Sequence, residues 1–259
     1  MIMGILNASP DSFANGGKAA TVEQGLAMIA AGAGILDIGG ESTRPGADII
    51  PAPEEQARVL PLIRALAGRG ADISVDTRNA STMQAALDAG ATIVNDVTGL
   101  SHDPDAAGVV ARAGCRVVLM HMRGTPRTMT GLAHYADIVK TVKHELSLRV
   151  QAAELAGVKR THIIVDPGIG FAKIAVQNIE ILQRLEEFSD FGLPILVGVS
   201  RKSFIGTYSG ETDPARRMPG SIAAALFAVQ HGASILRVHD VAETAQALQI
   251  WQRLGAGCS

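Results

Sequence analysis

The stretch that decides the fold runs from Ile163 to Asp166 and reads Ile-Ile-Val-Asp. Its first three residues are all β-branched. An uninterrupted apolar run of this kind is typical of a strand that is buried on both faces, whereas a strand with one wet face alternates apolar and polar residues. The run ends at a carboxylic acid, Asp166. The stretch therefore predicts a buried strand that presents a polar group at its carboxyl end.

Similar short apolar runs recur along the chain, and nearly every one is followed by a polar or charged residue. The eight predicted strands are Ile2–Leu6, Ile35–Ile38, Ile73–Val75, Thr92–Val94, Val117–Met120, Ile163–Val165, Ile195–Val199 and Ser234–Leu236. The stretches between them have helical spacing, and the predicted helices are Val22–Ala31, Pro53–Leu66, Ser81–Ala89, Asp103–Ala113, Asp137–Ala156, Val176–Phe188, Ser221–His231 and Val241–Leu254. Thr21 and Ser81 are predicted N-caps. Eight β-α units in a row predict a closed (β/α)8 barrel, the TIM barrel, whose chemistry collects at the carboxyl ends of the strands.

The size of the chain fits this architecture. One barrel of about 250 residues accounts for all of residues 1–259, so a single domain is expected. The 23 basic and 25 acidic residues are well mixed, and no Lys/Arg run indicates a nucleic-acid or membrane partner. Two cysteines, Cys115 and Cys258, do not make a disulfide framework or a metal site. We expect a cytoplasmic protein.

Acidic and amide side chains follow three neighbouring predicted strands. Asp76, Asn95, Asp96 and Asp166 would bring their oxygens to the carboxyl end of the barrel. Asp96 alternates in direction with Asn95, so a structural role is as plausible for it as a ligand role. Such a group suits a ligand rich in N–H donors, for example the guanidine-like edge of a heterocycle.

The last two strands carry the opposite chemistry. Lys202 and Ser203 follow the seventh strand, and Arg237 and His239 lie at period two in the eighth, which favours a shared anion. Barrel phosphate sites are often built by these two units. Arg201 is expected to be solvated surface charge. Together, the two groups indicate a heterocyclic ligand with a phosphate or diphosphate tail.

A metal site is less clearly marked. Asn7 and the acids could help to hold Mg²⁺, which keeps several waters and rides on substrate phosphates. His121 is expected to pack or hydrogen-bond at the end of the fifth strand and not to bind a metal. Phe171, in a predicted top loop, is equally compatible with core packing and with a wall for a flat substrate.

Five ordered motifs carry most of the polar residues that follow the predicted strands. They are Asn-Ala-Ser-Pro-Asp-Ser-Phe at 7–13, Gly-Gly-Glu-Ser-Thr-Arg-Pro-Gly at 39–46, Asp-Pro-Gly-Ile-Gly-Phe at 166–171, Ser-Arg-Lys-Ser-Phe at 200–204 and Arg-Val-His-Asp-Val at 237–241. Together with Asp76-Thr77 and Asn95-Asp96, these motifs resemble dihydropteroate synthase, and the resemblance runs from residue 1 to about 250. That family joins 6-hydroxymethyl-7,8-dihydropterin diphosphate to p-aminobenzoate in folate biosynthesis and releases pyrophosphate with Mg²⁺.

The resemblance implies a role for each candidate residue. It places Asp76, Asn95, Asp166 and Lys202 in a pterin cage, with Asp166 on the aminopyrimidine edge. It assigns the diphosphate to Arg237 and His239, and the magnesium contact to Asn7. Thr43, Arg44 and Pro45 resemble a second loop over the substrates, and Phe171 and Ser203 a p-aminobenzoate pocket. It implies that Asp76, Lys202, Arg237 and His239 are catalytic and that the chain forms a homodimer.

Two further features of the resemblance concern rate and inhibition. Asn15 stands where the family usually has Asp in the first loop, which removes a negative charge that could steady a cation. The stretch Phe171–Asn178 has the ordinary family length, whereas drug-resistant relatives carry an extra residue pair there. Turnover could therefore be affected by Asn15, and sulfonamides are expected to compete with p-aminobenzoate.

Three other readings of the sequence stay open. A methyltetrahydrofolate methyltransferase would share the pterin cage without needing Lys202, Arg237 and His239 as an anion grip. An aldolase-like enzyme would use Lys202 as a Schiff base, with its pKa lowered by Arg201. A disabled pterin-binding relative would bind the diphosphate without turning it over.

Overall fold

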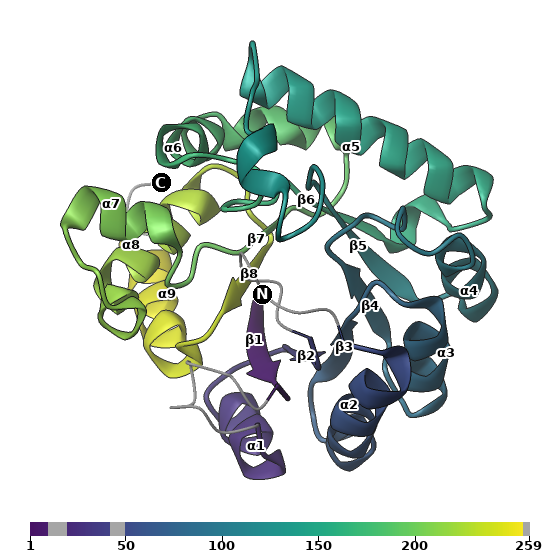
Figure 1. Ribbon diagram of the computed structural model, residues 1–259. Helices are drawn as coiled ribbons and strands as arrows, with labels where there is room; N and C mark the ends of the chain where they lie inside the picture. The colour runs from purple at the N-terminus through teal and green to yellow at the C-terminus, as the bar shows by residue number, and fades with distance from the viewer. Residues whose placement is uncertain (10–19, 42–49, 256–259) are drawn as a thin grey trace.

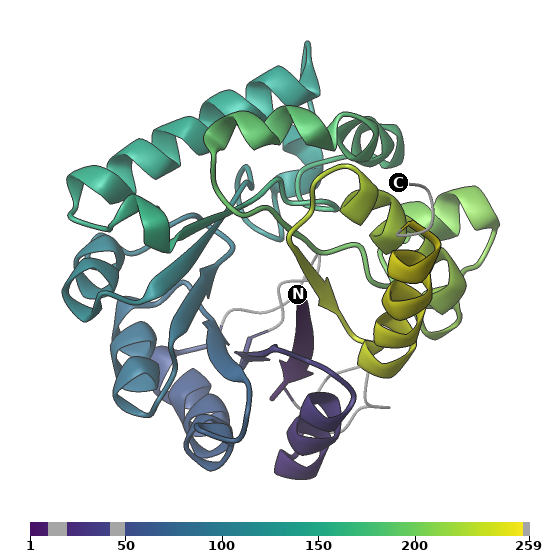
Figure 2. The ribbon, with the colours of Figure 1, turned by 180° about the vertical axis from the view of Figure 1, so that it is seen from behind.

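The computed structural model describes residues 1–9, 20–41 and 50–255, and its strands stand in a ring that helices surround (Figures 1 and 2). The strands are β1 Ile2–Asn7, β2 Ile35–Gly39, β3 Asp72–Asp76, β4 Ile93–Asp96, β5 Arg116–Met120, β6 Ile163–Asp166, β7 Leu196–Val197 and β8 Ile235–Val238. All paired strands are parallel, in the order β6-β5-β4-β3-β2-β1-β8-β7. A bridge between Val165 and Ile195 joins the two edges. The predicted (β/α)8 barrel is confirmed.

The helices lie outside the strands in chain order. They are α1 Val22–Ala30, α2 Ala52–Leu66, α3 Ala80–Asp88, α4 Ala106–Ala113, α5 Ile138–Leu155, α6 Ala175–Gln183, α7 Ser203–Ser209, α8 Met218–Gln230 and α9 Val241–Gly255. Short 3-10 turns cover Met129–Leu132, Arg160–His162, Leu185–Phe191 and Pro214–Arg217. Thr21 caps α1 as predicted, because its side chain accepts the backbone N–H of Gln24. In the described ranges, no helix is both long enough and apolar enough to span a bilayer.

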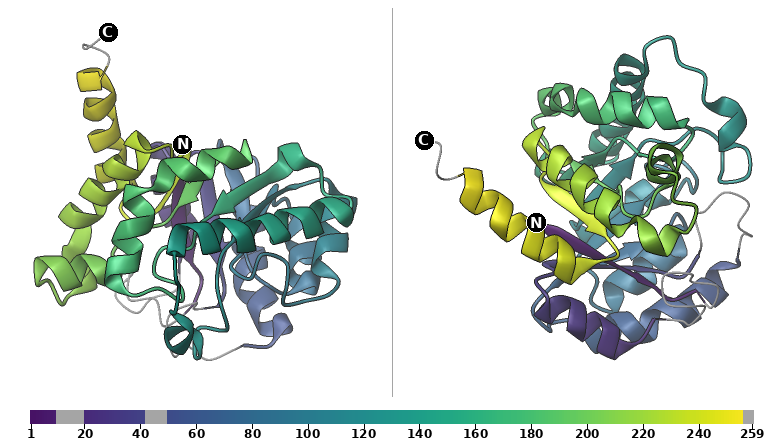
Figure 3. Two further views of the ribbon diagram at one scale, coloured as in Figure 1. Left: turned by 90° about the horizontal axis from the view of Figure 1, so that it is seen from above. Right: turned by 90° about the vertical axis from the view of Figure 1, so that its left-hand side faces the viewer.

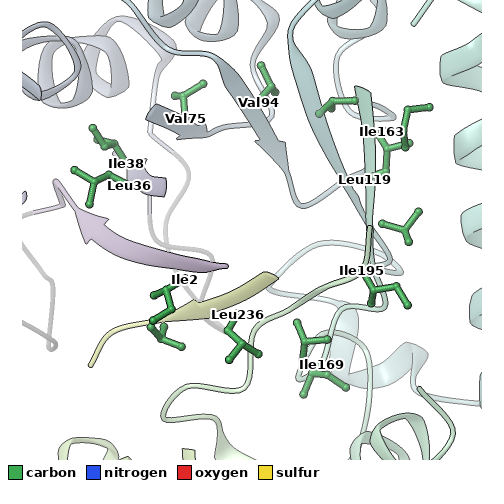
Figure 4. Packing of buried hydrophobic residues seen from close by; sticks show 14 of the residues in the cluster. Ile2, Leu36, Ile38, Val75, Val94, Leu119, Ile163, Ile169, Ile195 and Leu236 are labelled. Carbon is green, nitrogen blue, oxygen red and sulfur yellow. The ribbon is translucent and has the colours of Figure 1, made fainter. Parts of the chain in front are cut away.

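Alternation along the strands produces two apolar layers. The outward side chains pack under the helices, and Figure 4 shows part of this layer around Leu36, Val94 and Leu119. A second buried cluster contains one inward side chain from each of seven strands: Met3, Ile35, Ile93, Val118, Ile164, Leu196 and Ile235. Because side chains on a strand repeat every two residues, Asp37, Asn95, Asp166 and Arg237 face inward one step above this cluster. The inner layer is therefore the floor on which the polar site stands.

Several predicted boundaries were wrong for identifiable reasons. Ser81 is not an N-cap, because α3 begins at Ala80 and the N–H of Ala80 is bound by the carboxylate of Asp103 at 2.9 Å. The helix predicted from Asp103 begins only at Ala106. The predicted helix Val176–Phe188 ends at Gln183, since Arg184 has left helical backbone angles, and a 3-10 turn follows. The connection 198–220 after β7, for which the sequence predicted no helix, contains α7.

Candidate active site

The carboxyl ends of β3, β4, β6 and β8 bring the predicted acids and cations together. The register pairs Asp76 with Asn95 across β3 and β4. It pairs Met120 with Asp166 across β5 and β6. The side chains of Asp76, Asn95 and Asp166 are all buried. The acidic part of the predicted site is therefore assembled on strands, which hold their side chains more rigidly than loops do.

Asp37, in the middle of β2, is the centre of the hydrogen-bond network in this region. Its carboxylate accepts from Ser74 Oγ at 2.6 Å, Asn95 Nδ2 at 3.0 Å and Arg237 Nε at 2.6 Å. Arg237 also donates through Nη2 to Asp76 at 2.7 Å. Since Asp37 takes the amide nitrogen of Asn95, the amide oxygen of Asn95 is the atom left to accept an N–H from a ligand.

The reading of the sequence missed Asp37, although a signal was present. Attention went to residues that follow strands, and Asp37 lies inside the run Ile35-Leu36-Asp37-Ile38. A fully buried strand cannot carry an isolated carboxylate without a hydrogen-bonded or charged partner. An acid within such a run thus indicates a cation elsewhere, which here is Arg237 on β8.

In this network one positive charge, the guanidinium of Arg237, lies between two carboxylates, those of Asp37 and Asp76. Burial raises the pKa of Asp76 to about 7, although the Arg237 guanidinium opposes the rise. Asp76 can therefore change its protonation state near neutral pH, which is the range in which a group is useful as an acid or base. Arg237 was expected to share an anion with His239; in the structure two of its donors bind Asp37 and Asp76.

The loop after β6 brings Asp166, Phe171 and Lys202 together. Gly168 N donates to Asp166 Oδ1 at 2.7 Å, and no described side chain donates to the second oxygen of Asp166. Burial raises the pKa of Asp166, while the Gly168 hydrogen bond and the charge of Lys202 oppose the rise. Lys202 Nζ donates to Ile169 O at 2.6 Å and lies 4.2 Å from the centre of the Phe171 ring. Burial lowers the pKa of Lys202 to about 8, against the opposing charge of Asp166. Ser203 follows as the exposed first residue of α7.

The connections after β7 and β8 are tied to each other. His239 Nδ1 lies 2.9 Å from Ser200 Oγ. Arg201 was expected to be solvated surface charge, and this prediction was wrong. Its guanidinium makes two hydrogen bonds to Asp240, at 2.5 and 3.1 Å, and its side chain is only 18% exposed. Because Asp240 neutralises Arg201, the structure gives no support to an aldolase in which Arg201 activates Lys202.

The remaining candidates have different outcomes. Asp96 turns outward, and its carboxylate accepts from Thr98 and Leu100, which makes it a structural acid of its loop. His121 hydrogen-bonds Glu145 and Lys173 at the end of β5, which confirms the expected hydrogen bonding there. Asn15, Thr43, Arg44 and Pro45 lie outside the described residues.

The residues present are compatible with magnesium of the kind the sequence suggested. The described ranges contain no cluster of three or more His, Cys, Asp or Glu side chains that could hold a metal by themselves. Asn7, at the end of β1, is partly exposed, and its side-chain amide makes no hydrogen bond to another described residue. One such amide oxygen suits Mg²⁺, which takes few protein ligands when it is bound through substrate phosphates.

Comparison with known proteins is decisive at this point. A family model described as pterin binding enzyme matches residues 3–239. A curated dihydropteroate synthase from Synechocystis sp. is 44% identical over 254 residues, which is 96% of this chain and 88% of that protein. The chain belongs to the dihydropteroate synthase family. It is accordingly a transferase.

Solved structures of the dihydropteroate synthase family agree over nearly the whole chain. The Xanthomonas albilineans enzyme with 4-aminobenzoic acid is 45% identical, with a TM-score of 0.90, and the match covers 98% of this chain and 93% of that one. The Yersinia pestis enzyme in a sulfonamide drug complex is 40% identical, with a TM-score of 0.94, and covers 99% and 94%. The barrel of this chain is therefore the fold of the dihydropteroate synthase family.

Proposed function

We propose that this chain performs the dihydropteroate synthase reaction with the polar groups at the carboxyl end of its barrel. The reaction condenses 6-hydroxymethyl-7,8-dihydropterin diphosphate with p-aminobenzoate to give 7,8-dihydropteroate and pyrophosphate. The observation that carries the proposal is the set of inward acceptors above the apolar floor: the carboxylates of Asp76 and Asp166 and the fixed amide oxygen of Asn95. These groups match the N–H donors of a dihydropterin.

The pterin subsite is proposed to contain Asp76, Asn95, Asp166 and Lys202. The second oxygen of Asp166 would accept from the aminopyrimidine edge, since its first oxygen is held by Gly168. Lys202, beside Asp166 and over the Phe171 ring, would donate to a ring nitrogen or oxygen. Buried acceptors that are left unpaired in the absence of the correct donors are strongly selective for them.

The diphosphate and p-aminobenzoate subsites complete the proposal. Arg237 and His239 would bind the diphosphate, with Asn7 contacting Mg²⁺, which supplies positive charge to the departing pyrophosphate when it is bound. Phe171 and Ser203 would form the p-aminobenzoate subsite, and Thr43, Arg44 and Pro45 would belong to the second loop over the substrates. Phe171 is partly exposed beside Lys202, where a flat ring could stack.

The chemistry requires no side-chain nucleophile. The family mechanism implies that the C–O bond breaks ahead of attack and leaves a cation delocalised into the dihydropterin, to which the amine of p-aminobenzoate adds. The buried carboxylates of Asp76 and Asp166 would stabilise this cation, and the apolar floor would exclude water from its lower side. Asp76, with its pKa of about 7, is the acid in the cage best placed to exchange a proton with the pterin ring near neutral pH.

The test measures pyrophosphate release from the dihydropterin diphosphate, with and without p-aminobenzoate, in Mg²⁺ and in EDTA. We expect release that requires both p-aminobenzoate and Mg²⁺, with an equal amount of dihydropteroate. Release without p-aminobenzoate would mean that water captures the cation. A ligand that binds but releases no pyrophosphate would overturn the proposal in favour of a disabled relative.

Asn15→Asp is expected to raise kcat, because it restores a negative charge that could steady the cation. The measurement is the steady-state rate of dihydropteroate formation with both substrates saturating. An unchanged or lower kcat would show that this charge does not contribute to turnover.

Sulfonamides are expected to inhibit competitively with p-aminobenzoate, because the stretch Phe171–Asn178 carries no inserted pair that would narrow the subsite. Initial rates at several drug and p-aminobenzoate concentrations distinguish competitive from other inhibition. Full activity at low p-aminobenzoate in the presence of micromolar drug would contradict this expectation.

We also propose a cytoplasmic homodimer. Its contact face would be the side of α8 and α9 where the exposed side chains of Ile250 and Leu254 line an apolar groove with Ile222 and Leu226. Figure 3 shows α9 extending beyond the other helices at its carboxyl end. Light scattering gives the mass in solution and decides between monomer and dimer.

A further inference from the structure

A chain of charged and polar groups outside the proposed substrate contacts ends at Lys173, in the connection between β6 and α6. The Lys173 ammonium donates to His121 Nδ1 at 3.0 Å, to Gly168 O at 3.0 Å and to Phe171 O at 2.9 Å. With a longer contact of 3.5 Å to His121 O, these acceptors take up all of its N–H groups. The Lys173 ammonium is therefore saturated with hydrogen bonds to protein atoms. Two of its acceptors, Gly168 O and Phe171 O, are carbonyl groups of its own loop.

His121 accepts a hydrogen bond from the Lys173 ammonium, and Glu145 in turn contacts His121. Glu145, on α5, lies 2.9 Å from His121 Nε2, and Arg123 binds the same carboxylate through Nε at 3.1 Å. Burial lowers the pKa of His121 to about 4, and the hydrogen bond from His121 lowers the pKa of Glu145 to about 2. At neutral pH the imidazole is thus uncharged. It donates from Nε2 to the Glu145 carboxylate and accepts at Nδ1 from Lys173.

The loop that Lys173 organises is packed closely against the end of β5. A Cβ atom at Gly168, where φ is +70°, would lie 2.0 Å from the carbonyl oxygen of His121. On the other side, Tyr135 Oη donates to Ala172 O at 2.9 Å. Between these two anchors lies Phe171, whose ring faces Lys202. The backbone position of Phe171 depends directly on Lys173, since the ammonium binds the Phe171 carbonyl.

We propose that Lys173 is a positioning residue for the p-aminobenzoate subsite, and that Glu145 and His121 orient its ammonium. This inference rests on the proposed function, in which Phe171 forms one wall of that subsite. Without the ammonium, the carbonyls of Gly168 and Phe171 lose their shared donor in a partly buried place, so the loop must rearrange. A displacement of about 1 Å at a substrate wall is enough to cost a large factor in rate or affinity.

The first test compares Lys173→Met with Lys140→Met, a matched change at a lysine on α5 whose side chain is 79% exposed. For Lys173→Met we expect KM for p-aminobenzoate to rise at least tenfold. KM for the dihydropterin diphosphate should rise less than KM for p-aminobenzoate, because Asp76 and Asn95 stay on their strands and only Asp166 is tied to this loop, through Gly168 N. Lys140→Met should leave both values unchanged. An unchanged KM for p-aminobenzoate, or an equal rise in both KM values, would overturn the inference.

The second test separates the two nitrogens of His121 and does not require a lysine variant that folds. In His121→Asn the amide oxygen can replace Nδ1 and accept from Lys173, whereas in His121→Gln the amide nitrogen can replace Nε2 and donate to Glu145. We expect His121→Gln to raise KM for p-aminobenzoate at least fivefold and His121→Asn to raise it less than threefold. Equal effects of the two variants would exclude orientation through Nδ1.

The wild-type assay distinguishes failure of this inference from failure of the proposed function. If the wild-type chain forms no dihydropteroate, the proposed function is wrong and this inference falls with it. If the wild type is active and the Lys173 and His121 variants keep its KM for p-aminobenzoate, only the positioning role is wrong.

Discussion

Asp166→Asn is expected to lower kcat/KM for the dihydropterin diphosphate roughly a thousandfold. The substitution places a buried amide N–H donor opposite the N–H donors of the ligand. In the structure, one carboxylate oxygen of Asp166 accepts from Gly168 N, and the other remains for the ligand. An amide supplies only one acceptor. If its oxygen stays on Gly168, its NH₂ group faces the N–H groups of the aminopyrimidine edge. Steady-state kinetics with p-aminobenzoate saturating measure this loss.

A matched control for this variant lies at the opposite end of the barrel. Asp72→Asn, at the amino end of β3, removes a carboxylate that is 40% exposed and pairs with Arg116. It should leave kcat/KM within a factor of about 2, because exposed ion pairs contribute little. Thermal unfolding of both variants confirms that they are folded. A loss of less than tenfold in a folded Asp166→Asn protein would remove Asp166 from the pterin subsite.

Arg237→Met is expected to lower the free energy of unfolding at pH 7 by about 3–5 kcal/mol, the usual cost of removing one partner from a buried ionic group. The guanidinium lies between Asp37 and Asp76, and the Asp37 side chain is fully buried. Methionine fills much of the same space but leaves two carboxylates close together without a cation. Urea unfolding, with the slope of the transition checked for two-state behaviour, gives the difference.

The pH dependence of that loss follows from the protonation of Asp76. Its folded-state pKa is about 7, above the ordinary value of 3.8, so the folded chain binds more protons than the unfolded chain between these values. Stability from this group therefore falls as pH rises through that window. Removing Arg237 raises the pKa further and extends the window above pH 7, so the variant should be most impaired at alkaline pH and least impaired near pH 5.

A double variant checks the cause of that destabilisation. Adding Asp76→Asn to Arg237→Met removes one of the two facing charges and should recover part of the lost stability above pH 7. Lys173 contributes equally to every protein compared, because neither Arg237 nor Asp76 is among the charges that shift its pKa. Lys202 does not, because the charge of Arg237 lowers its pKa and the charge of Asp76 raises it. A loss in Arg237→Met that does not vary with pH would contradict this account.

The barrel could be predicted because its strands are buried on both faces and are therefore uninterrupted apolar runs. Two features, Asp37 and helix α7, were not predicted from this pattern of apolar runs. Asp37 was overlooked inside such a run because its partners, Asn95 and Arg237, are far away in sequence. Helix α7 was taken for a loop because it has only seven residues, too few to show an apolar period.

The site residues at strand ends could be predicted from the sequence. The residues whose roles depend on contacts with distant parts of the chain could not. Asp76, Asn95 and Asp166 lie where the alternation of strand side chains puts them. Arg201 was misjudged because only the fold places Asp240 beside it. The role of Lys173 depends on His121 and Glu145, which belong to different β-α units, and no spacing along the chain brings those three together.

The barrel is closed by weak pairing between β6 and β7, and we expect local opening of the strands to begin there. In the described structure, a single bridge, Val165 to Ile195, joins β6 to β7, while β1 and β2 share five registered pairs. The ring is thus an eight-stranded sheet whose two edges meet at one seam. Asp166 lies on one side of that seam, and Lys202 follows the strand on the other. Hydrogen exchange should therefore be faster for the amide of Val165, which bonds to Pro194 O across the seam, than for the amides between β1 and β2. The proposed pterin subsite therefore spans the seam at which the described strands share the fewest registered pairs.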